Sequence, residues 1–366
     1  MKAVVLAGGQ EFGQCPLSRQ APRALWPLVD RPLIEHVLSV LRKAGVGHMA
    51  ISANGRTHAI AQHLGYNPTP DITIHYSEDT MPRGTAGCIR DCEQWIGDQS
   101  FVVVQGASVL LDVDFDELIK QHKQTGAALT VAASSDGNGQ LDGALKPTGV
   151  YVCEPVVFPY IKPRGFQDIK EQLIPRLSEA GLKVGAASIG GKVLTIRNEE
   201  SYLNAMVCLL NDPRYRKSFV EHLVAKLPGL WIDPTAYLHP KARVIGPVYV
   251  GASAKLMADS LVIGPAIVGE NCELGTEAVV HESILWSGAV VGAGAMVEQA
   301  VAASNSHVHQ GVEVRGSIVL DTSLSTAERQ SLSNSTDLTP AEINNPVGFW
   351  RRLWRSIRPG ATAQAE

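Results

Sequence analysis

The first part of the chain alternates short apolar runs with segments of helical spacing. Residues 2–7 form an apolar run that ends in two glycines, and residues 101–105 form another that ends at Gly106. Between them, residues 33–44 carry apolar side chains three and four positions apart, as in an amphipathic helix. Alternating strands and helices predict an α/β domain whose parallel sheet is covered by helices on both faces. Ligands bind such sheets at the carboxyl ends of the strands, where both glycine loops are expected.

From about residue 231 the pattern changes to a period of six. An aliphatic residue recurs at every sixth position, and glycines and other small residues fill the gaps. The positions are Ile232, Leu238, Val244, Val250, Leu256, Val262, Val268, Leu274 and Val280, followed after one irregular step by Val291 and Val297. The period is too long for a helical turn and too regular for loops. It predicts a coil with three flat sides, each burying one aliphatic side chain, and resembles the hexads of left-handed β-helix proteins.

These patterns divide the chain into four parts. We expect an α/β domain over 1–225, a left-handed parallel β-helix over 231–320, a flexible linker over 321–345 and a basic amphipathic helix over 346–358. The last segment combines aromatic, aliphatic and arginine side chains, namely Phe349, Trp350, Arg351, Leu353, Trp354, Arg355 and Ile357. Such a composition is typical of a helix that lies on an anionic membrane surface. Docking to a protein partner, such as a membrane glycosyltransferase, is the alternative.

Composition narrows the class of protein. The chain has 366 residues, 19% of them charged, and a formal net charge of -4, which indicates a globular protein and gives no general attraction to nucleic acid. The six cysteines are scattered and complete no zinc motif, so we expect reduced thiols in a cytoplasmic protein. We see no signal peptide and no apolar run of membrane-spanning length. The expected localisation is cytoplasmic, with peripheral attachment at the inner face of the membrane as an option.

Several motifs then follow one another in order. After Leu6-Ala7-Gly8-Gly9, Pro16-Leu17 and Pro22-Arg23-Ala24-Leu25 keep the spacing of the signature Gly-Gly-x-Gly-Thr-Arg-Leu-x-Pro-Leu-Thr and Pro-Lys-Pro-Leu. Further matches lie at 82–87, 149–151, 165–175 and 199–203. Together these motifs resemble the sugar-1-phosphate nucleotidyltransferases, or NDP-sugar pyrophosphorylases, which make NDP-sugars from an NTP and a sugar phosphate. The resemblance covers about residues 1–320 and implies a Rossmann-like nucleotidyltransferase domain before the β-helix.

The resemblance also implies where ligands bind. The implied nucleotide-binding residues are Ala7, Gly8, Gly9, Arg23, Gly84, Thr85 and Ala86, and the implied sugar-binding residues are Gly149, Asp168 and Lys146. Each has a structural alternative. The glycine pair also suits a tight turn, Thr85 and Asp168 also suit helix caps, and Arg23 also suits a surface ion pair.

Four positions depart from the family pattern. Glu11 replaces the third loop glycine and would repel a triphosphate, and Gly13 replaces the loop arginine. Ala107 and Thr195 occupy the positions of the two aspartates that hold magnesium in the family. A methyl group cannot bind Mg²⁺ and a single hydroxyl binds it poorly. Since nucleotidyl transfer depends on positioning and electrostatics, we expect no catalytic residue and no metal cofactor.

The resulting hypothesis is a catalytically degenerate, nucleotide-sugar-binding protein with a regulatory or scaffold role in surface polysaccharide or glycoconjugate biosynthesis. Two alternatives remain open. One is an active NTP:sugar-1-phosphate nucleotidyltransferase with a rearranged Mg²⁺ site, for which Asp79, Asp112 or Asp114 would have to supply ligands. The other is a structural assembly protein that binds no nucleotide. In each case we expect the flat sides of the β-helix to form a homo-oligomer.

Overall fold

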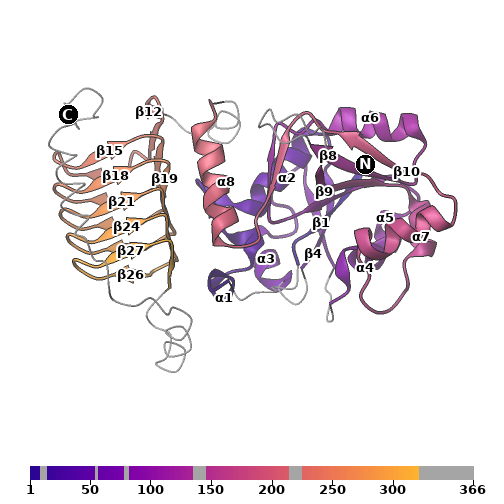
Figure 1. The fold of residues 1–366 in the computed structure, drawn as a ribbon, viewed down its shortest axis with the longest axis horizontal. Coiled ribbons are helices and arrows are strands. Elements are labelled where there is room, and N and C mark those ends of the chain that lie inside the picture. The colour runs from indigo at the N-terminus through magenta and orange to yellow at the C-terminus, as the bar shows by residue number, and fades with distance from the viewer. Residues whose placement is uncertain (9–14, 54–56, 78–81, 135–145, 214–224, 321–366) are drawn as a thin grey trace. The chain divides into compact units, whose positions relative to one another are not determined.

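The computed structural model describes residues 1–8, 15–53, 57–77, 82–134, 146–213 and 225–320. The chain separates into two compact units, Met1–His222 and Leu223–Glu366 (Figure 1). The expected linker and amphipathic helix lie outside the described residues, as do Gly9, Glu11, Gly13 and Asp79. Within the described segments no helix is long and apolar enough to cross a membrane.

A seven-stranded sheet forms the centre of the first unit, in the order β10-β8-β9-β6-β1-β4-β5. β1 runs parallel to both of its neighbours, β4 and β6, whereas β9 runs antiparallel to β6 and β8. The strands are β1 (Lys2–Leu6), β4 (His48–Ser52), β5 (Thr73–Ser77), β6 (Phe101–Gln105), β8 (Leu129–Ser134), β9 (Lys146–Cys153) and β10 (Val184–Ser188). The carboxyl ends of β1, β4 and β6 and the beginning of β9 therefore meet at one edge of the sheet.

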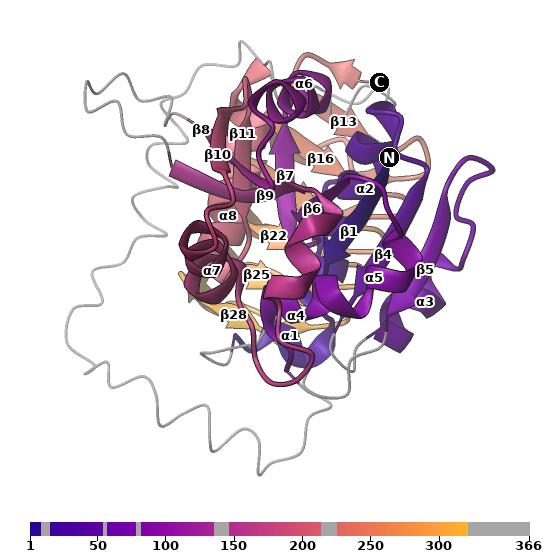
Figure 2. The ribbon, with the colours of Figure 1, turned by 90° about the vertical axis from the view of Figure 1, so that its right-hand side faces the viewer.

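Helices cover both faces of this sheet (Figures 1 and 2). They are α1 (Leu17–Gln20), η1 (Arg23–Leu25), α2 (Leu33–Lys43), α3 (Thr57–Leu64), α4 (Gly84–Asp91), α5 (Glu93–Ile96), α6 (Phe115–Thr125), η2 (Pro155–Tyr160), the π-helix η3 (Ile169–Leu173), α7 (Ile174–Glu179) and α8 (Glu199–Asn211).

The side chains of β1 show why the apolar run reads as a strand buried on both faces. Ala3 and Val5 belong to the core cluster formed with α2, α3 and α6. Val4 and Leu6 belong to a second cluster, formed with α4, α5 and α7. Successive side chains of a strand point to opposite faces, so a continuous apolar run requires cover on both. The predicted α/β architecture is confirmed.

Two smaller sheets complete the first unit. β2 (Pro27–Leu28) pairs with β3 (Arg31–Pro32) in a short hairpin. β7 (Ser108–Leu111) continues the chain after β6 and pairs antiparallel with β11 (Lys192–Thr195), which leads into α8. The second pair ties the segment that follows β6 to the segment that precedes α8.

The second unit is the predicted β-helix, built from three parallel sheets. One contains β13 (Leu230–Ile232), β16 (Val248–Val250), β19 (Ala266–Val268), β22 (Ile284–Leu285), β25 (Val301–Ala302) and β28 (Ile318–Val319), with β12 (Ala225–Leu227) antiparallel at its edge. Another contains β14 (Tyr237–Leu238), β17 (Lys255–Leu256), β20 (Glu273–Leu274), β23 (Val290–Val291) and β26 (His307–Val308). The last contains β15 (Arg243–Ile245), β18 (Leu261–Ile263), β21 (Val279–His281), β24 (Met296–Glu298) and β27 (Glu313–Arg315).

The hexads stack in this coil as their spacing predicts. Leu238 pairs with Leu256, and Leu256 pairs with Leu274, so three hexads complete one turn. Leu274 then pairs with Val291 and Val291 with Val308, so that each turn after Leu274 is a residue shorter, beginning at the irregular step of the sequence. The side chains of Leu256, Leu274 and Val291 are fully buried in a single apolar cluster. Burial of one aliphatic residue per side of each turn therefore sets the register of the coil.

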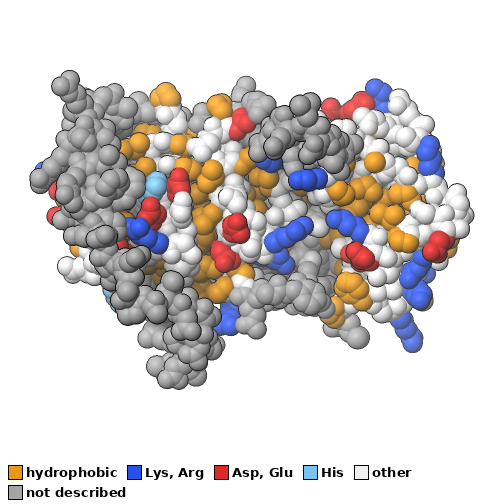
Figure 3. Space-filling model, viewed as in Figure 1, with side chains coloured by type: hydrophobic (Ala, Val, Ile, Leu, Met, Phe, Trp, Pro, Cys, Tyr) orange, Lys and Arg blue, Asp and Glu red, His pale blue; other side chains and the backbone are white. Residues whose placement is uncertain are grey.

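Charged side chains of both signs are interspersed on the face of the molecule shown in Figure 3. This distribution agrees with the small net charge of -4. The visible surface therefore offers no extended field of one sign that would attract nucleic acid.

The coil yields the first prediction. We expect Leu274→Ala to lower the free energy of unfolding of the β-helix unit by about 2–5 kcal/mol, because it opens a cavity between neighbouring turns. Urea titration followed by circular dichroism measures this loss. Lys255→Ala is the control: its side chain is exposed and pairs with Glu273, so we expect a loss below about 1 kcal/mol. Equal losses in the two variants would contradict the assignment of Leu274 to the core.

Candidate functional site

The two glycine loops at the carboxyl ends of β1 and β6 pack closely together. The N–H groups of Ala7 and Gly8 both donate to the carbonyl oxygen of Ser52, at 2.8 and 3.0 Å. The N–H of Gly106 donates to the carbonyl of Leu6 at 2.9 Å, and a Cβ on this glycine would lie 3.1 Å from the Cβ of Ala7. The backbone donors of Ala7 and Gly8, in the described part of the first loop, are thus bound to the end of β4.

The beginning of α4 is closed by the segment that leads into η3. Gly84 has φ +73°, and a Cβ there would collide with the carbonyl of Gln167. The same carbonyl accepts hydrogen bonds from the N–H of Ala86 at 2.9 Å and of Gly87 at 3.2 Å. The backbone donors that a helix N-terminus offers to an anion are here occupied by the protein.

Thr85 and Asp168, implied as nucleotide and sugar contacts, lie together at this junction. The hydroxyl of Thr85 donates to the carboxylate of Asp168 at 2.8 Å and accepts from the N–H of Ile169 at 2.9 Å. The Asp168 carboxylate also accepts from the N–H groups of Lys170 and Glu171, which makes it the N-cap of η3. Burial and, second, the nearby carboxylate of Asp168 raise the pKa of the Tyr151 phenol. Thr85 and Asp168 therefore both take part in structural hydrogen bonds, and their roles as nucleotide and sugar contacts stay predictions.

The sugar side of the candidate site lies at β6 and β9. Gly149 has φ +80°, and a Cβ there would come within 3.2 Å of the side-chain amide nitrogen of Gln105. Lys146 is exposed at the first position of β9, where it pairs with Ser134. Gln105 was not among the residues expected at the site. The signal for it is a polar side chain at the carboxyl end of an otherwise apolar strand.

Ala107 and Thr195, the positions that carry metal-binding aspartates in the family, are neighbours in the structure. Thr195 pairs with Ser108 at the end of β11. The N–H of Ile196 then donates to the carbonyl oxygen of Ala107 at 2.9 Å. The two strands thus bring together two positions 88 residues apart in sequence, 107 and 195, and neither carries a carboxylate. A methyl group and one hydroxyl do not fit magnesium, which is bound through oxygen ligands that include carboxylates.

Two arginines lie beside this pair. A terminal guanidinium nitrogen of Arg23, in η1, donates to the carbonyl of Arg197 at 3.1 Å. Arg197 lies two residues after the end of β11 and is exposed. Nearby, the thiol of Cys15 contacts the carboxylate of Glu199 at 3.5 Å, and burial, with a further effect of Glu199, raises the Cys15 pKa to about 11. Arg197 was not expected at the site, although it stands only two residues after Thr195 in the sequence.

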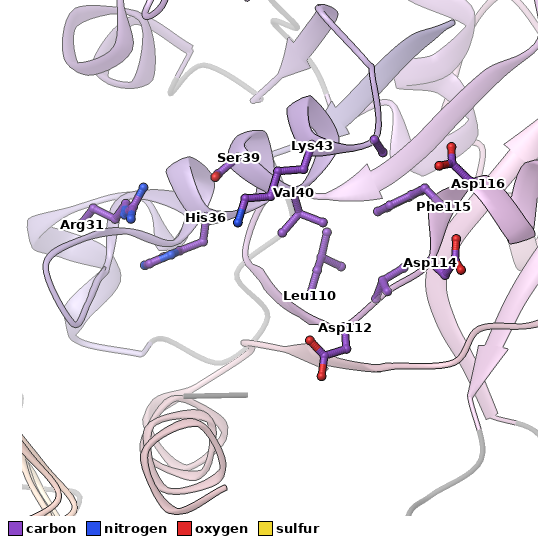
Figure 4. Close-up of a pocket in the computed structure, with 12 residues that line it drawn as sticks. Arg31, His36, Ser39, Val40, Lys43, Leu110, Asp112, Asp114, Phe115 and Asp116 are labelled. Atoms are coloured by element: carbon purple, nitrogen blue, oxygen red, sulfur yellow. The ribbon is translucent and has the colours of Figure 1, made fainter. Parts of the chain in front are cut away.

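A hollow of about 330 Å³ lies between α2 and the beginning of α6, apart from the sheet edge (Figure 4). Its floor includes Val40, Leu110 and Phe115, and its rim carries charged side chains of both signs. Asp112 and Asp114 belong to this rim. Asp112 lies at the far end of β7 from Ala107, about 16 Å along the strand at ~3.3 Å per residue. Asp114 caps α6 by accepting from the N–H of Glu117. The structure therefore does not bring these two acids to the Ala107 position.

The described segments contain no group of three or more His, Cys, Asp or Glu side chains arranged to hold a metal ion. The polar and cationic side chains described at the sheet edge include Gln105, Arg23 and Arg197. Such groups suit binding of a polar, anionic ligand through charge-assisted hydrogen bonds.

Comparison with known proteins agrees with this organisation. The family model described as "Nucleotidyl transferase" matches residues 2–140, and the model "GMPPB C-terminal domain" matches residues 244–348. A UTP–glucose-1-phosphate uridylyltransferase of Synechocystis sp. is 24% identical over 339 residues, which covers 81% of this chain and 85% of the relative.

Two further relatives are named for another sugar phosphate. The mannose-1-phosphate guanylyltransferase catalytic subunit beta of Dictyostelium discoideum is 25% identical over 266 residues, covering 65% of this chain and 73% of the relative. A mannose-1-phosphate guanyltransferase of Debaryomyces hansenii is 32% identical over 136 residues, covering 37% of this chain and 38% of the relative. The chain therefore has a nucleotidyl transferase domain and a GMPPB C-terminal domain, and its homologues are sugar-1-phosphate nucleotidyltransferases.

Proposed function

We propose that this chain binds a nucleotide sugar at the carboxyl edge of its N-terminal sheet without transferring a nucleotidyl group. In this proposal it acts as a regulatory or scaffold component of surface polysaccharide or glycoconjugate biosynthesis. The observation that carries the proposal is the pairing of β7 with β11. It places Ala107 beside the Thr195 segment, so the two positions that hold magnesium in active relatives lie together without a carboxylate.

The chemistry of the reaction explains why this loss matters. A sugar phosphate must approach a triphosphate, so two polyanions meet while pyrophosphate leaves. Catalysis of such transfers rests on positioning and on cations that neutralise the developing charge. Loss of a single electrostatic donor typically costs about 10²–10³ in rate, and loss of the metal ion costs several kcal/mol more. Glu11 and Gly13 add a repulsive charge and remove an arginine in the first loop.

The described carboxylates near the edge have other roles. Asp168 accepts hydrogen bonds from Thr85 and from the first N–H groups of η3. Glu199 lies in the first turn of α8 against the Cys15 thiol. Asp112 and Asp114 line the distant hollow between α2 and α6. This distribution supports a site that works without a divalent cation.

Two features support binding of a nucleotide sugar rather than a purely structural role. The named relatives act on glucose-1-phosphate or mannose-1-phosphate, so UDP-glucose and GDP-mannose are the first candidate ligands. Gln105 places its amide against Gly149 at the sheet edge, and the described part of the chain provides no hydrogen-bond partner for that amide. An amide in this position suits hydroxyl groups of a sugar. We further propose that the β-helix forms a homo-oligomer and that residues 346–358 attach the protein to the membrane surface or to a glycosyltransferase there.

Isothermal titration of the purified full chain against NTPs and NDP-sugars, with magnesium and with excess EDTA, tests this function. We expect one NDP-sugar to bind with affinities that agree within about twofold in the two conditions, since no metal ligand contributes. We expect no pyrophosphate release on adding a sugar phosphate. Magnesium-dependent NTP binding with turnover would instead establish an active enzyme, and no binding at all would leave a structural assembly protein.

Restoring the carboxylates gives a second test. In the double variant Ala107→Asp/Thr195→Asp, we expect magnesium to tighten binding of the NDP-sugar about tenfold or more, which corresponds to ~1.4 kcal/mol. The reason is that two adjacent carboxylates bind Mg²⁺, which then also binds the diphosphate. Titration with and without EDTA measures the ratio.

The matched control for this test is Ala107→Asn/Thr195→Asn, which has nearly the same shape without the charge. We expect its affinity to stay indifferent to magnesium. If the aspartate variant also ignores magnesium while it still binds the NDP-sugar, the two positions do not form the former metal site.

A further inference from the structure

The Ala107 and Thr195 positions carry no negative charge, and two arginines, Arg23 and Arg197, lie beside them. Arg23 and Arg197 are held together by the hydrogen bond from the Arg23 guanidinium to the Arg197 carbonyl, at 3.1 Å. Arg197 is two residues beyond Thr195, next to Ile196, whose N–H bonds to Ala107. Arg197 thus lies within two residues of the Thr195 position, and it is exposed.

Neither guanidinium is neutralised by a carboxylate among the described residues. In the portion of the chain that the structure describes, no ion pair joins Arg23 or Arg197 to a carboxylate. The acids nearest to Arg197 in sequence are in the first turn of α8, where Glu199 lies against the Cys15 thiol and Glu200 is exposed. The acid nearest to Arg23 in sequence is Asp30, which pairs with Arg31. Two unpaired guanidinium groups at one sheet edge form an anion-binding arrangement, since each presents a fork of donors that matches phosphate oxygens.

We propose that Arg197, together with Arg23, binds the diphosphate of the nucleotide sugar in place of a divalent cation. This inference rests on the proposed function and specifies how that site recognises its ligand. Two guanidinium groups carry the same total charge as one magnesium ion, so they neutralise a diphosphate without carboxylates to hold a metal. The change from aspartates to Ala107 and Thr195 removes the groups that would otherwise pair with Arg197 and cancel its charge.

The test compares two variants that each lose one positive charge. Arg197→Gln removes the proposed diphosphate contact, and Lys123→Gln removes an exposed charge from α6. Binding of GDP-mannose and UDP-glucose is measured by titration calorimetry in excess EDTA. We expect Arg197→Gln to weaken the bound NDP-sugar about tenfold or more, as for loss of a charge-assisted hydrogen bond, and Lys123→Gln to leave it unchanged. Arg197→Lys, which keeps the charge but loses the fork, is expected to fall between wild type and Arg197→Gln.

Two further readouts separate a diphosphate contact from a structural effect. Guanosine and uridine lack phosphate, so any affinity that they show is expected to be equal in wild type and Arg197→Gln. The affinity of the NDP-sugar is expected to fall less steeply with salt in Arg197→Gln, since one ionic contact is missing. Because the Arg197 side chain is exposed, the thermal unfolding midpoint is expected to stay the same.

The possible results distinguish the two levels of the proposal. If wild type binds an NDP-sugar in EDTA and Arg197→Gln binds it equally well, the role of Arg197 is overturned and the proposed function stands. If wild type binds an NDP-sugar only with magnesium, a metal ion performs the role assigned to the guanidinium groups. If wild type binds no NDP-sugar in either condition, the proposed function fails and this inference fails with it.

Discussion

The first unit depends on the burial of β1 on both faces. Val4 and Val5 point into different core clusters, and hydrogen bonds to β4 and β6 hold the strand from both sides. Because neighbouring parallel strands end at the same edge, this one strand aligns the glycine loop after β1 with Gly106 after β6. The position of the candidate site is thus a consequence of the same apolar packing that stabilises the sheet.

At that edge, many polar groups that could bind a ligand form hydrogen bonds within the protein instead. The carbonyl of Gln167 accepts hydrogen bonds from the N–H groups of Ala86 and Gly87 in α4. The carbonyl of Ser52 accepts them from the N–H groups that follow β1. Asp168 serves as a helix cap and as a partner of Thr85. Among the described residues, Gln105, Arg23 and Arg197 are polar or cationic groups at this edge that could still form hydrogen bonds to a ligand. The proposed binding of a nucleotide sugar relies on these groups, since an amide suits sugar hydroxyls and guanidinium groups suit a diphosphate.

The β-helix is stabilised in a different way. Each turn buries aliphatic residues against the turns above and below, so its stability accumulates turn by turn. The shorter turns from Leu274 to Val291 and from Val291 to Val308 show that the coil tolerates one residue fewer per turn while the inward positions stay paired. Flat parallel sides result from this repetition, and they supply the surface on which the proposed homo-oligomer depends.

The sequence by itself determined the elements that depend on local or periodic patterns. The apolar run of β1, the amphipathic spacing of α2 and the hexads from Ile232 onward each specify a partner surface through their period alone. The motif order also indicated the family, and the absence of aspartate at Ala107 and Thr195 was visible as a matter of residue identity. Only the tertiary structure decided that β11 returns beside β7, that Gln167 closes the beginning of α4 and that Arg23 reaches Arg197. These contacts join segments roughly 80 to 170 residues apart, and no local propensity encodes such pairings, because they depend on how the whole sheet and its helices pack.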